Sequence, residues 1–184
     1  MIKLDYFNIL VIGGGKVAYR KVSTLLRCGG RVTVLSQKLD DDFKNLMGQF
    51  IWIQDHYKKE NLEGATLVIA ATNDQKLNAA IGKECLEKGV LCNVVSSKEL
   101  SSFIVPASVR RGDLVLSVST QGKSPMLAQR IKKELEEKYD ERYEGYVKVL
   151  GEARENIKSH VKDKEVKKEM IKALVLKKEG KQNK

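Results

Sequence analysis

A glycine-rich turn near the start of the chain has the residue types and the spacing that bind a dinucleotide. Gly13, Gly15 and Ala18 fit the pattern G-x-G-x-x-A, directly after an apolar run and directly before a helical pattern. A pyrophosphate can approach the backbone only where side chains are absent, and its charge is then stabilised by free N–H groups at the helix N-terminus. Ala18 is small enough to let that helix pack closely on the strands. The turn therefore predicts a dinucleotide site.

The ribose end of this site has no acidic residue in the sequence. A carboxylate that binds the ribose hydroxyls is expected about 20 residues beyond the glycines, at the end of the second strand. The chain instead has Leu35-Ser36-Gln37-Lys38 at this point. Ser36 or Gln37 could bind the ribose, whereas Lys38 would favour a 2′-phosphate. NAD and NADP therefore both remain candidates.

A second polar segment follows another apolar run. Thr72, Asn73 and Asp74 come directly after Ala70-Ala71. Ligands of open α/β folds bind outside the carboxyl ends of the strands, which is where these residues are expected. They are candidates for a ligand site or for the cap of the next helix, and the two roles are compatible.

The elements that position these residues alternate regularly over the first hundred residues. Residues 7–12 form a continuous apolar run that predicts a strand buried on both faces, and further strands are predicted at 31–35, 51–54, 66–70 and 90–95. Between them, apolar residues at helical spacing predict helices at 16–28, 39–47 and 74–88. Strands that alternate with helices indicate an α/β fold with a parallel, doubly wound sheet of the Rossmann type.

The pattern changes near Pro106. Residues 114–119 alternate apolar and polar side chains, as a half-exposed strand does, and Ser124-Pro125 has the cap and first residue of a helix. We expect one long helix from Met126, with a break near Gly145 or Gly151, followed by a basic helical tail. Three parts result, at residues 1–105, 106–140 and 141–184.

Composition narrows the class of protein further. The formal charge of +10 arises from 34 Lys and Arg against 24 Asp and Glu, and twelve against six of these lie from Lys148 onward. This surplus favours a solvated helical face or an anionic ligand over nucleic acid. Three scattered cysteines predict neither a disulfide framework nor a metal site, and no apolar run is long enough to span a membrane. We expect a soluble, cytoplasmic protein.

Four ordered motifs give the chain a more specific resemblance. The strings VIGGGKVAYRK, AATNDQKLN, CNVVSSKELSSFIVPA and LSVSTQGKSPMLAQRIKKELE occur in this order between about residues 7 and 140. In order and spacing they resemble the precorrin-2 dehydrogenase family, which includes the dehydrogenase/ferrochelatase module of sirohaem synthase. The resemblance implies NAD-dependent oxidation of precorrin-2 to sirohydrochlorin in sirohaem or cobalamin (porphyrin-type) biosynthesis.

The same resemblance implies an architecture and a set of cofactor residues. Members are homodimers with a Rossmann domain, here 1–105, a dimerisation segment, here 106–140, and a helical region, here 141–184. Some members also insert ferrous iron. The implied contacts are with the pyrophosphate, the adenosine ribose and the nicotinamide side, and the cofactor-binding set is Gly13, Gly15, Lys16, Val17, Ser36, Gln37, Thr72, Asn73 and Asn93.

One position departs from the family pattern. In members of the family an aspartate, proposed as a base, follows the Asn-Val-Val segment, but Ser96 follows Asn93-Val94-Val95 here. A serine hydroxyl accepts no proton near neutral pH without a partner. Either water takes the proton, or another group such as Asp74, Asp113 or Glu99 does. We therefore expect a dehydrogenase without chelatase activity, with Ser96, Asp74 and Asp113 as candidate catalytic residues.

The substrate of the family is a polycarboxylate, which gives basic residues after residue 105 a specific purpose. Arginine suits bidentate pairing with carboxylates, and a turn that leads into a helix N-terminus favours anions. The predicted substrate-binding residues are Arg110, Arg111, Thr120, Lys123 and Ser124, with Arg130 a further candidate. Each is alternatively a solvated charge or a helix cap. The competing functions are a non-catalytic NAD(H)-sensing or tetrapyrrole-binding module and, from the basic tail, a nucleic-acid-binding regulator.

Overall fold

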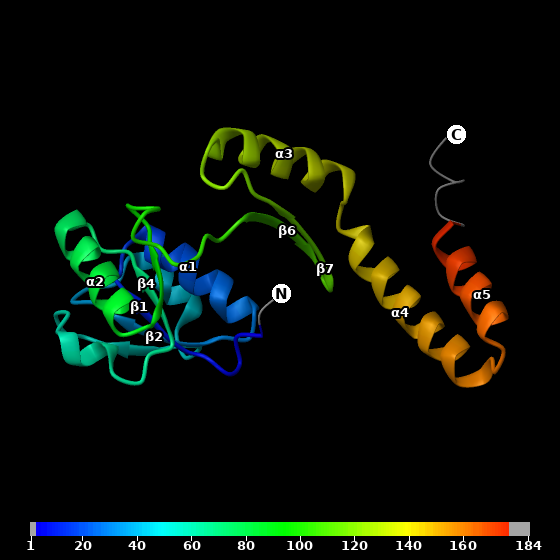
Figure 1. Ribbon diagram of the computed structural model, residues 1–184, viewed down its shortest axis with the longest axis horizontal. Helices are drawn as coiled ribbons and strands as arrows, with labels where there is room; N and C mark the ends of the chain where they lie inside the picture. Colours follow the sequence, from blue (N-terminus) through cyan, green and yellow to red (C-terminus); the bar gives the residue numbers. More distant parts are fainter. Residues whose placement is uncertain (1–2, 177–184) are drawn as a thin grey trace. The chain divides into compact units, whose positions relative to one another are not determined.

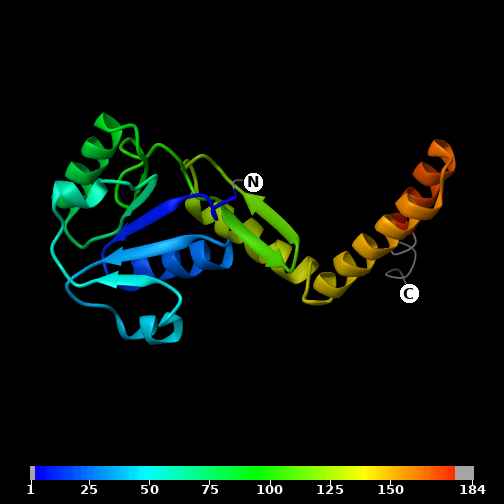
Figure 2. The ribbon, with the colours of Figure 1, turned by 90° about the horizontal axis from the view of Figure 1, so that it is seen from below.

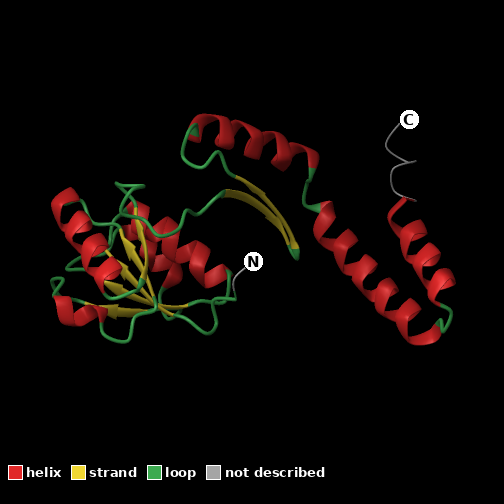
Figure 3. Ribbon diagram, viewed as in Figure 1, coloured by secondary structure: helices red, strands yellow, loops and turns green. Residues whose placement is uncertain are grey.

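A computed structural model describes residues 3–176, and these divide into two compact units. The first unit extends to Val105 and the second begins at Pro106. Figure 1 follows the chain through the helices and strands, and Figure 3 separates helix from strand by colour. The last eight residues of the predicted basic tail, 177–184, lie outside the described residues. The predicted boundary at residue 140 stays a prediction.

The first unit is built on a parallel sheet of five strands, as the alternating pattern predicted. The strand order is β3-β2-β1-β4-β5, and every neighbouring pair is parallel. Figure 2 shows the strands of this sheet pointing the same way. The strands are β1 (Asn8–Ile12), β2 (Arg31–Leu35), β3 (Ile51–Ile53), β4 (Leu67–Ala70) and β5 (Leu91–Val94).

Alternate side chains of the sheet enter two separate clusters. Val11 and Val34 point to the face covered by α1 (Lys16–Arg27), where Ala18 is fully buried, as the glycine motif requires. Val68 and Ala70 of the neighbouring strand point to the other face, under α2 (Gln75–Glu87). Because β1 and β4 are covered on both faces, their continuous apolar runs are explained.

Two connections of the first unit are 3₁₀ helices. The helix predicted at 39–47 is the shorter 3₁₀ helix η1 (Asp41–Leu46). The Asp40 carboxylate accepts a hydrogen bond from the Asp42 N–H at its start, and only Phe43 of the six residues is buried. One anchoring side chain suits a short, tight helix better than an α-helix, which needs an apolar stripe. A second one, η2 (Lys59–Leu62), lies between β3 and β4.

Three free cysteines lie at different depths in the first unit. Cys28 is exposed after α1, whereas Cys85 on α2 and Cys92 on β5 are buried. The neighbouring Cys85 thiol, together with burial, raises the pKa of the Cys92 thiol. Both behave as small apolar groups where α2 packs on β5.

The second unit is a β-hairpin followed by three helices. β6 (Ala107–Arg111) pairs antiparallel with β7 (Leu114–Val118), and α3 (Pro125–Lys138) packs on both strands. The Ser124 hydroxyl accepts a hydrogen bond from Leu127 N–H, which confirms the predicted cap. Strand β6 had not been predicted. The remaining helices, α4 (Arg142–His160) and α5 (Lys164–Leu176), pack against one another.

The breaks between these helices are not where glycine suggested. Gly145 and Gly151 both lie inside α4, so the predicted break near either residue was wrong. The helices restart after Asp140 and Asp163, whose carboxylates accept hydrogen bonds from the N–H groups of the following turn. Glycine within an exposed helix costs only about 1 kcal/mol, so Gly145 and Gly151 do not interrupt α4. Within residues 3–176, no helix combines the length and the apolar character that a membrane span requires.

Candidate functional site

A hollow of about 450 Å³ lies at the carboxyl ends of β1, β2, β3 and β4. Its position matches the edge of the sheet where ligands bind in open α/β folds. The glycine turn, the polar ends of β2 and β3, and the segment after β4 all reach it. Its lining consists of Ile12, Gly13, Gly14, Gly15, Leu35, Ser36, Gln37, Lys38, Leu39, Asp40, Asp55, His56, Tyr57, Ala71, Thr72, Asn73 and Leu77.

The three positions of the turn are occupied by glycine for different structural reasons. Gly13 has φ +123°, and a Cβ there would overlap the Ala71 carbonyl oxygen. A Cβ on Gly14 would overlap the Lys38 carbonyl oxygen. Gly15 has an ordinary backbone conformation (φ −86°), and a Cβ there would meet no atom within 4 Å. The chain itself therefore requires glycine at 13 and 14, whereas glycine at 15 keeps open a space beside the hollow.

The N-terminus of α1 is suited to an anion. Gly15 is its cap residue, so no side chain accepts a hydrogen bond from the first turn, and no acidic residue lies in that turn. The first N–H groups of an α-helix have no partner within the helix, and the helix dipole adds partial positive charge there. The space at Gly15, next to Lys16 and Val17, therefore fits the pyrophosphate of a dinucleotide, and the residues present are compatible with NAD.

At the other side of the hollow, side chains from β3 and the residues after it form hydrogen bonds with the residues that follow β2. The Trp52 indole N–H donates to the Ser36 carbonyl oxygen at 3.1 Å and to its Oγ at 3.2 Å. The Gln54 amide donates to the Gln37 carbonyl oxygen at 3.1 Å, and the Gln37 side chain is hydrogen-bonded to His56 Nε2. Both predicted ribose residues, Ser36 and Gln37, are thus held in place at the hollow.

The segment after β4 is fixed by a buried amide that the sequence analysis did not identify. Asn78 on α2 is 1% exposed; its Oδ1 accepts from the Thr72 N–H and hydroxyl, and its Nδ2 donates to the Thr72 carbonyl. Thr72 and Asn73 line the hollow, while Asp74 caps α2 through bonds from Lys76 N–H and Leu77 N–H to its Oδ1. Asn78 could have been found from its spacing, one turn beyond the cap and facing the sheet.

Three predicted cofactor residues do not line the hollow: Lys16 and Val17, which follow Gly15 at the start of α1, and Asn93. Asn93 lies on β5 and is 8% exposed; its Nδ2 donates to the Phe103 carbonyl at 3.1 Å. Among the residues described, its buried Oδ1 meets no hydrogen-bond donor. Ser96, a predicted catalytic residue, is exposed in the turn that follows β5. The structure therefore does not bring Asn93 and Ser96 together with the glycine turn.

The other predicted residues belong to the second unit. The contacts of Arg111 lie within that unit. Its Nε donates to the Tyr139 carbonyl at 2.9 Å, and its guanidinium forms an ion pair with Glu141 at 3.3 Å. Thr120 Oγ1 accepts from Ser124 N–H at 3.1 Å, and Ser124 caps α3. The side chains that remain exposed are Arg110, Asp113, Lys123 and Arg130.

Several lining residues had no signal in the motif. Asp55 and Tyr57 reach the hollow because β3 lies next to β2 and ends at the same edge, whereas Asp40, after β2, is held to the glycine turn by a bond from its N–H to the Gly14 carbonyl. Tyr57 donates to Glu84 Oε2 at 2.6 Å, and burial together with this carboxylate raises the pKa of its phenol, so Tyr57 is neutral at physiological pH. The strand order, which a single sequence does not give, would have identified Asp55 and Tyr57.

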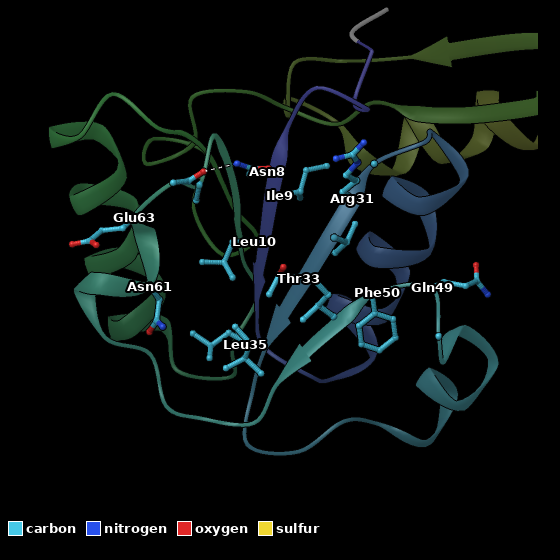
Figure 4. Close-up of a pocket in the computed structure, with 17 residues that line it drawn as sticks. Asn8, Ile9, Leu10, Arg31, Thr33, Leu35, Gln49, Phe50, Asn61 and Glu63 are labelled. Carbon is cyan, nitrogen blue, oxygen red and sulfur yellow. Dashed lines mark hydrogen bonds between the residues drawn. The ribbon is translucent and has the colours of Figure 1, made fainter.

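A second hollow, of about 690 Å³, lies on the face of the sheet opposite α1. Figure 4 shows Leu10, Thr33 and Leu35 along its floor, with Asn61 and Glu63 on one side. No residue of the dinucleotide motif lines it. Nowhere in residues 3–176 do three His, Cys, Asp or Glu side chains gather as a metal site would require.

Comparison with known proteins gives the same relationship over most of the chain. Residues 1–107 match the family described as putative NAD(P)-binding, and residues 111–138 match the central domain of sirohaem biosynthesis proteins. Siroheme synthase 2 of Yersinia pestis (strain Pestoides F) is 36% identical over 155 residues, which cover 83% of this chain and 33% of that protein. Siroheme synthase 1 of Serratia proteamaculans (strain 568) is 41% identical over 130 residues, or 70% and 27% of the two chains.

The chain thus spans about a third of the length of these siroheme synthases. A solved structure described as SirC, precorrin-2 dehydrogenase, is 31% identical with a TM-score of 0.80, and the match covers 95% of this chain and 87% of that one. The sequence identity, the shared fold and the NAD(P)-binding first unit agree. The chain belongs to the precorrin-2 dehydrogenase family of sirohaem biosynthesis proteins.

Proposed function

We propose that this protein oxidises precorrin-2 to sirohydrochlorin with NAD as the hydride acceptor. The observation that carries the proposal is the open space at Gly15, because it lies at the uncapped N-terminus of α1 and beside the hollow. Family membership supplies the substrate class. NAD, when bound, accepts the hydride, and one proton leaves the substrate in the same oxidation.

In this proposal, residues of the first unit bind and orient the dinucleotide. The backbone N–H groups at Gly15, Lys16 and Val17 hold the pyrophosphate, and Gly13 makes the bend that presents them. Ser36 and Gln37 receive the adenosine ribose. Thr72 and Asn73 face the nicotinamide side, where Asn78 fixes Thr72. Holding the reacting atoms in one geometry is the main contribution that this site makes to the rate.

Asp74 accepts the proton in this proposal. Among the candidate catalytic residues, Ser96 carries no basic group. Asp74 directly follows Asn73 of the hollow, and both of its capping bonds go to one carboxylate oxygen, Oδ1. Its other oxygen, Oδ2, is the atom assigned to take the proton.

The variant Asp74→Asn tests this role, because asparagine is an equally good helix cap. We expect kcat to fall by about a hundredfold, the usual contribution of a general base, with an unchanged melting temperature and NAD affinity. Asp42→Asn, at an exposed acid of η1, is the control. An unchanged kcat in Asp74→Asn would assign proton removal to water.

Substrate carboxylates are bound by basic residues of the second unit. Arg110 and Lys123 are exposed, so they are the proposed carboxylate partners. Arg111, Thr120 and Ser124 hold the segment around them through the contacts described above. Truncation of Arg110 or Lys123 should therefore raise KM more than it lowers kcat.

The main test is an assay of purified protein with precorrin-2 and NAD. NADH formation with stoichiometric sirohydrochlorin is expected. A folded protein that binds NAD and the tetrapyrrole without forming NADH would contradict the proposal and support a carrier or sensor. Ser96→Asp tests the absence of chelatase activity: a large gain in iron or cobalt insertion, with NADH formation unchanged, is expected if this position limits metal insertion.

The homodimer is also part of the proposal. No described side chain of α4 or α5 is buried, and Val166 and Met170 lie one turn apart on α5 with 50% and 44% of their surface exposed. A second copy would cover these apolar side chains. The double variant Val166→Glu with Met170→Glu should therefore sediment as a monomer, whereas Lys168→Glu, on another face of α5, should not change the sedimentation. A monomeric wild-type protein at micromolar concentration would contradict the homodimer.

A further inference from the structure

The adenosine end of the hollow has a carboxylate, although not on the strand where the fold normally carries it. β2 ends at Leu35 and is followed by Ser36 and Gln37, where an acidic residue would bind the ribose hydroxyls. Two other carboxylates line the hollow, those of Asp40 and Asp55. The question is which of them replaces the missing acid.

The sheet register places Asp55 beside the vacant position. Leu35 of β2 pairs with Ile53 of β3, and the Ser36 N–H donates to the Ile53 carbonyl at 3.1 Å, so the two strands remain adjacent at their ends. Asp55 follows the end of β3 by two residues, in a turn where its N–H donates to the Ile53 carbonyl at 3.1 Å. The residues on either side of it, Gln54 and His56, are both hydrogen-bonded to the ribose residue Gln37.

The Asp55 carboxylate is fixed and charged. Its Oδ1 accepts from the His56 N–H at 2.7 Å, and its Oδ2 accepts from Lys58 Nζ at 2.9 Å. The hydrogen bond from Lys58 is the largest cause that lowers the pKa of this carboxyl group, so the group is ionised at neutral pH. A carboxylate has about four acceptor positions, and two bonds leave room for ribose hydroxyls. The side chain is 45% exposed, so a ligand can reach it.

Asp40 is less suited to the same role. Its carboxylate accepts from the Asp42 N–H and caps η1, and its own N–H donates to the Gly14 carbonyl at 2.7 Å. These bonds tie Asp40 to the glycine turn and to η1. Asp55, by contrast, stands next to His56, which holds the Gln37 side chain.

We propose that Asp55 is a specificity-determining residue, which binds the adenosine ribose hydroxyls and selects NAD over NADP. This inference rests on the proposed function. A 2′-phosphate would meet the Asp55 carboxylate, and like charges at this separation repel. Without Asp55, Lys58 and the neighbouring Lys38 would present two cations to a 2′-phosphate.

The test compares Asp55→Asn with a matched control. Asp41 forms the same kind of pair, with Lys44 three residues on at 2.7 Å, but does not line the hollow. Wild type, Asp55→Asn, Asp55→Ser and Asp41→Asn are titrated with NAD and with NADP by calorimetry, without substrate. Circular dichroism and thermal unfolding confirm that each variant is folded.

We expect wild type to prefer NAD, and Asp55→Asn to lose about tenfold in NAD affinity and to gain about tenfold for NADP, the effect of one charge-assisted hydrogen bond and one removed repulsion. Asp55→Ser should shift the ratio in the same direction, and Asp41→Asn should leave it unchanged. An unchanged NAD-to-NADP ratio in both Asp55 variants, or a wild type that prefers NADP, would overturn this inference alone. A folded wild type that binds neither dinucleotide would contradict the proposed function and the inference together.

Discussion

The two units of the chain are stabilised in different ways. In the first unit both faces of β1 and β4 are closed by apolar side chains, and nearly all of the buried residues belong to it. In the described part of the second unit only Val109 and Ala128 are buried apolar residues. Its helices are supported by caps and by exposed ion pairs, such as Arg130–Glu134, that contribute less than about 1 kcal/mol each. Burial within one chain therefore explains the first unit but not the second, which is the physical reason to propose a second copy.

The largest expected effect tests whether the cofactor site depends on the first unit alone. Gly15→Asp places a carboxylate in the open space at the N-terminus of α1, where the pyrophosphate is expected. Two like charges about 4 Å apart repel by several kcal/mol at a partly buried site, so NAD affinity should fall by at least about a hundredfold. Calorimetric titration measures this loss, and retained affinity would refute the assigned turn.

The matched variant at Gly13 should have the opposite profile. Gly13→Ala forces a Cβ onto the Ala71 carbonyl at a positive φ, so it should lower the free energy of unfolding. Gly15→Asp should leave that free energy nearly unchanged, because φ at Gly15 is accessible to any residue. Urea unfolding measures the free energy of unfolding of both variants. It thereby distinguishes a glycine that the chain itself needs from one that leaves room for the ligand.

An effect of intermediate size is expected when a valine of each unit is replaced by alanine, which compares how deeply the two units bury their apolar side chains. Val11 is completely buried in the sheet, whereas Val149 on α4 is 61% exposed. Val11→Ala should cost about 2 kcal/mol, from two lost methyl groups and the cavity they leave, and Val149→Ala should change stability by less than about 0.5 kcal/mol in the monomer. Urea unfolding at low protein concentration measures both. A large cost for Val149→Ala only at high concentration would place Val149 in the dimer interface.

The smallest effect is expected when one helix-capping side chain of each unit is removed. Asp74 caps α2 in the first unit, and Ser124 caps α3 in the second. Removal of either side chain by mutation to alanine should cost about 1 kcal/mol. If thermal unfolding shows two transitions, Asp74→Ala should lower the first unit's midpoint only, and Ser124→Ala the second unit's only. A shift of both midpoints by one variant would show that the units unfold cooperatively.

The parts of the structure that the sequence predicted are those with strong local signals. Buried strands are continuous apolar runs, and Gly13, Gly15 and Ala18 mark the turn, so the parallel sheet and the glycine turn at its edge could be found. Ser124-Pro125 likewise marked the start of α3. Strand β6 was missed because its sequence, ASVRR, has only one buried residue, Val109, and two arginines.

The parts that could not be predicted depend on neighbours distant in the sequence. Asp55 and Tyr57 reach the hollow because β3 pairs with β2, and no local pattern encodes that adjacency. Arg111 has the residue type of a carboxylate ligand, but its guanidinium binds the end of α3. A charged side chain near a predicted anion site is therefore ambiguous until the strand and helix partners are known.

Because the three cysteines of the first unit differ in burial, their reactivity with a thiol reagent can measure local opening of this unit. Cys28 should react with a thiol reagent at once, whereas Cys85 and Cys92 become accessible only when α2 separates from β5. The rate at which the second and third thiols are labelled therefore measures how often that part of the domain opens. Because Asn78 links the same helix to Thr72, a bound dinucleotide should slow this labelling while the reaction of Cys28 continues unchanged.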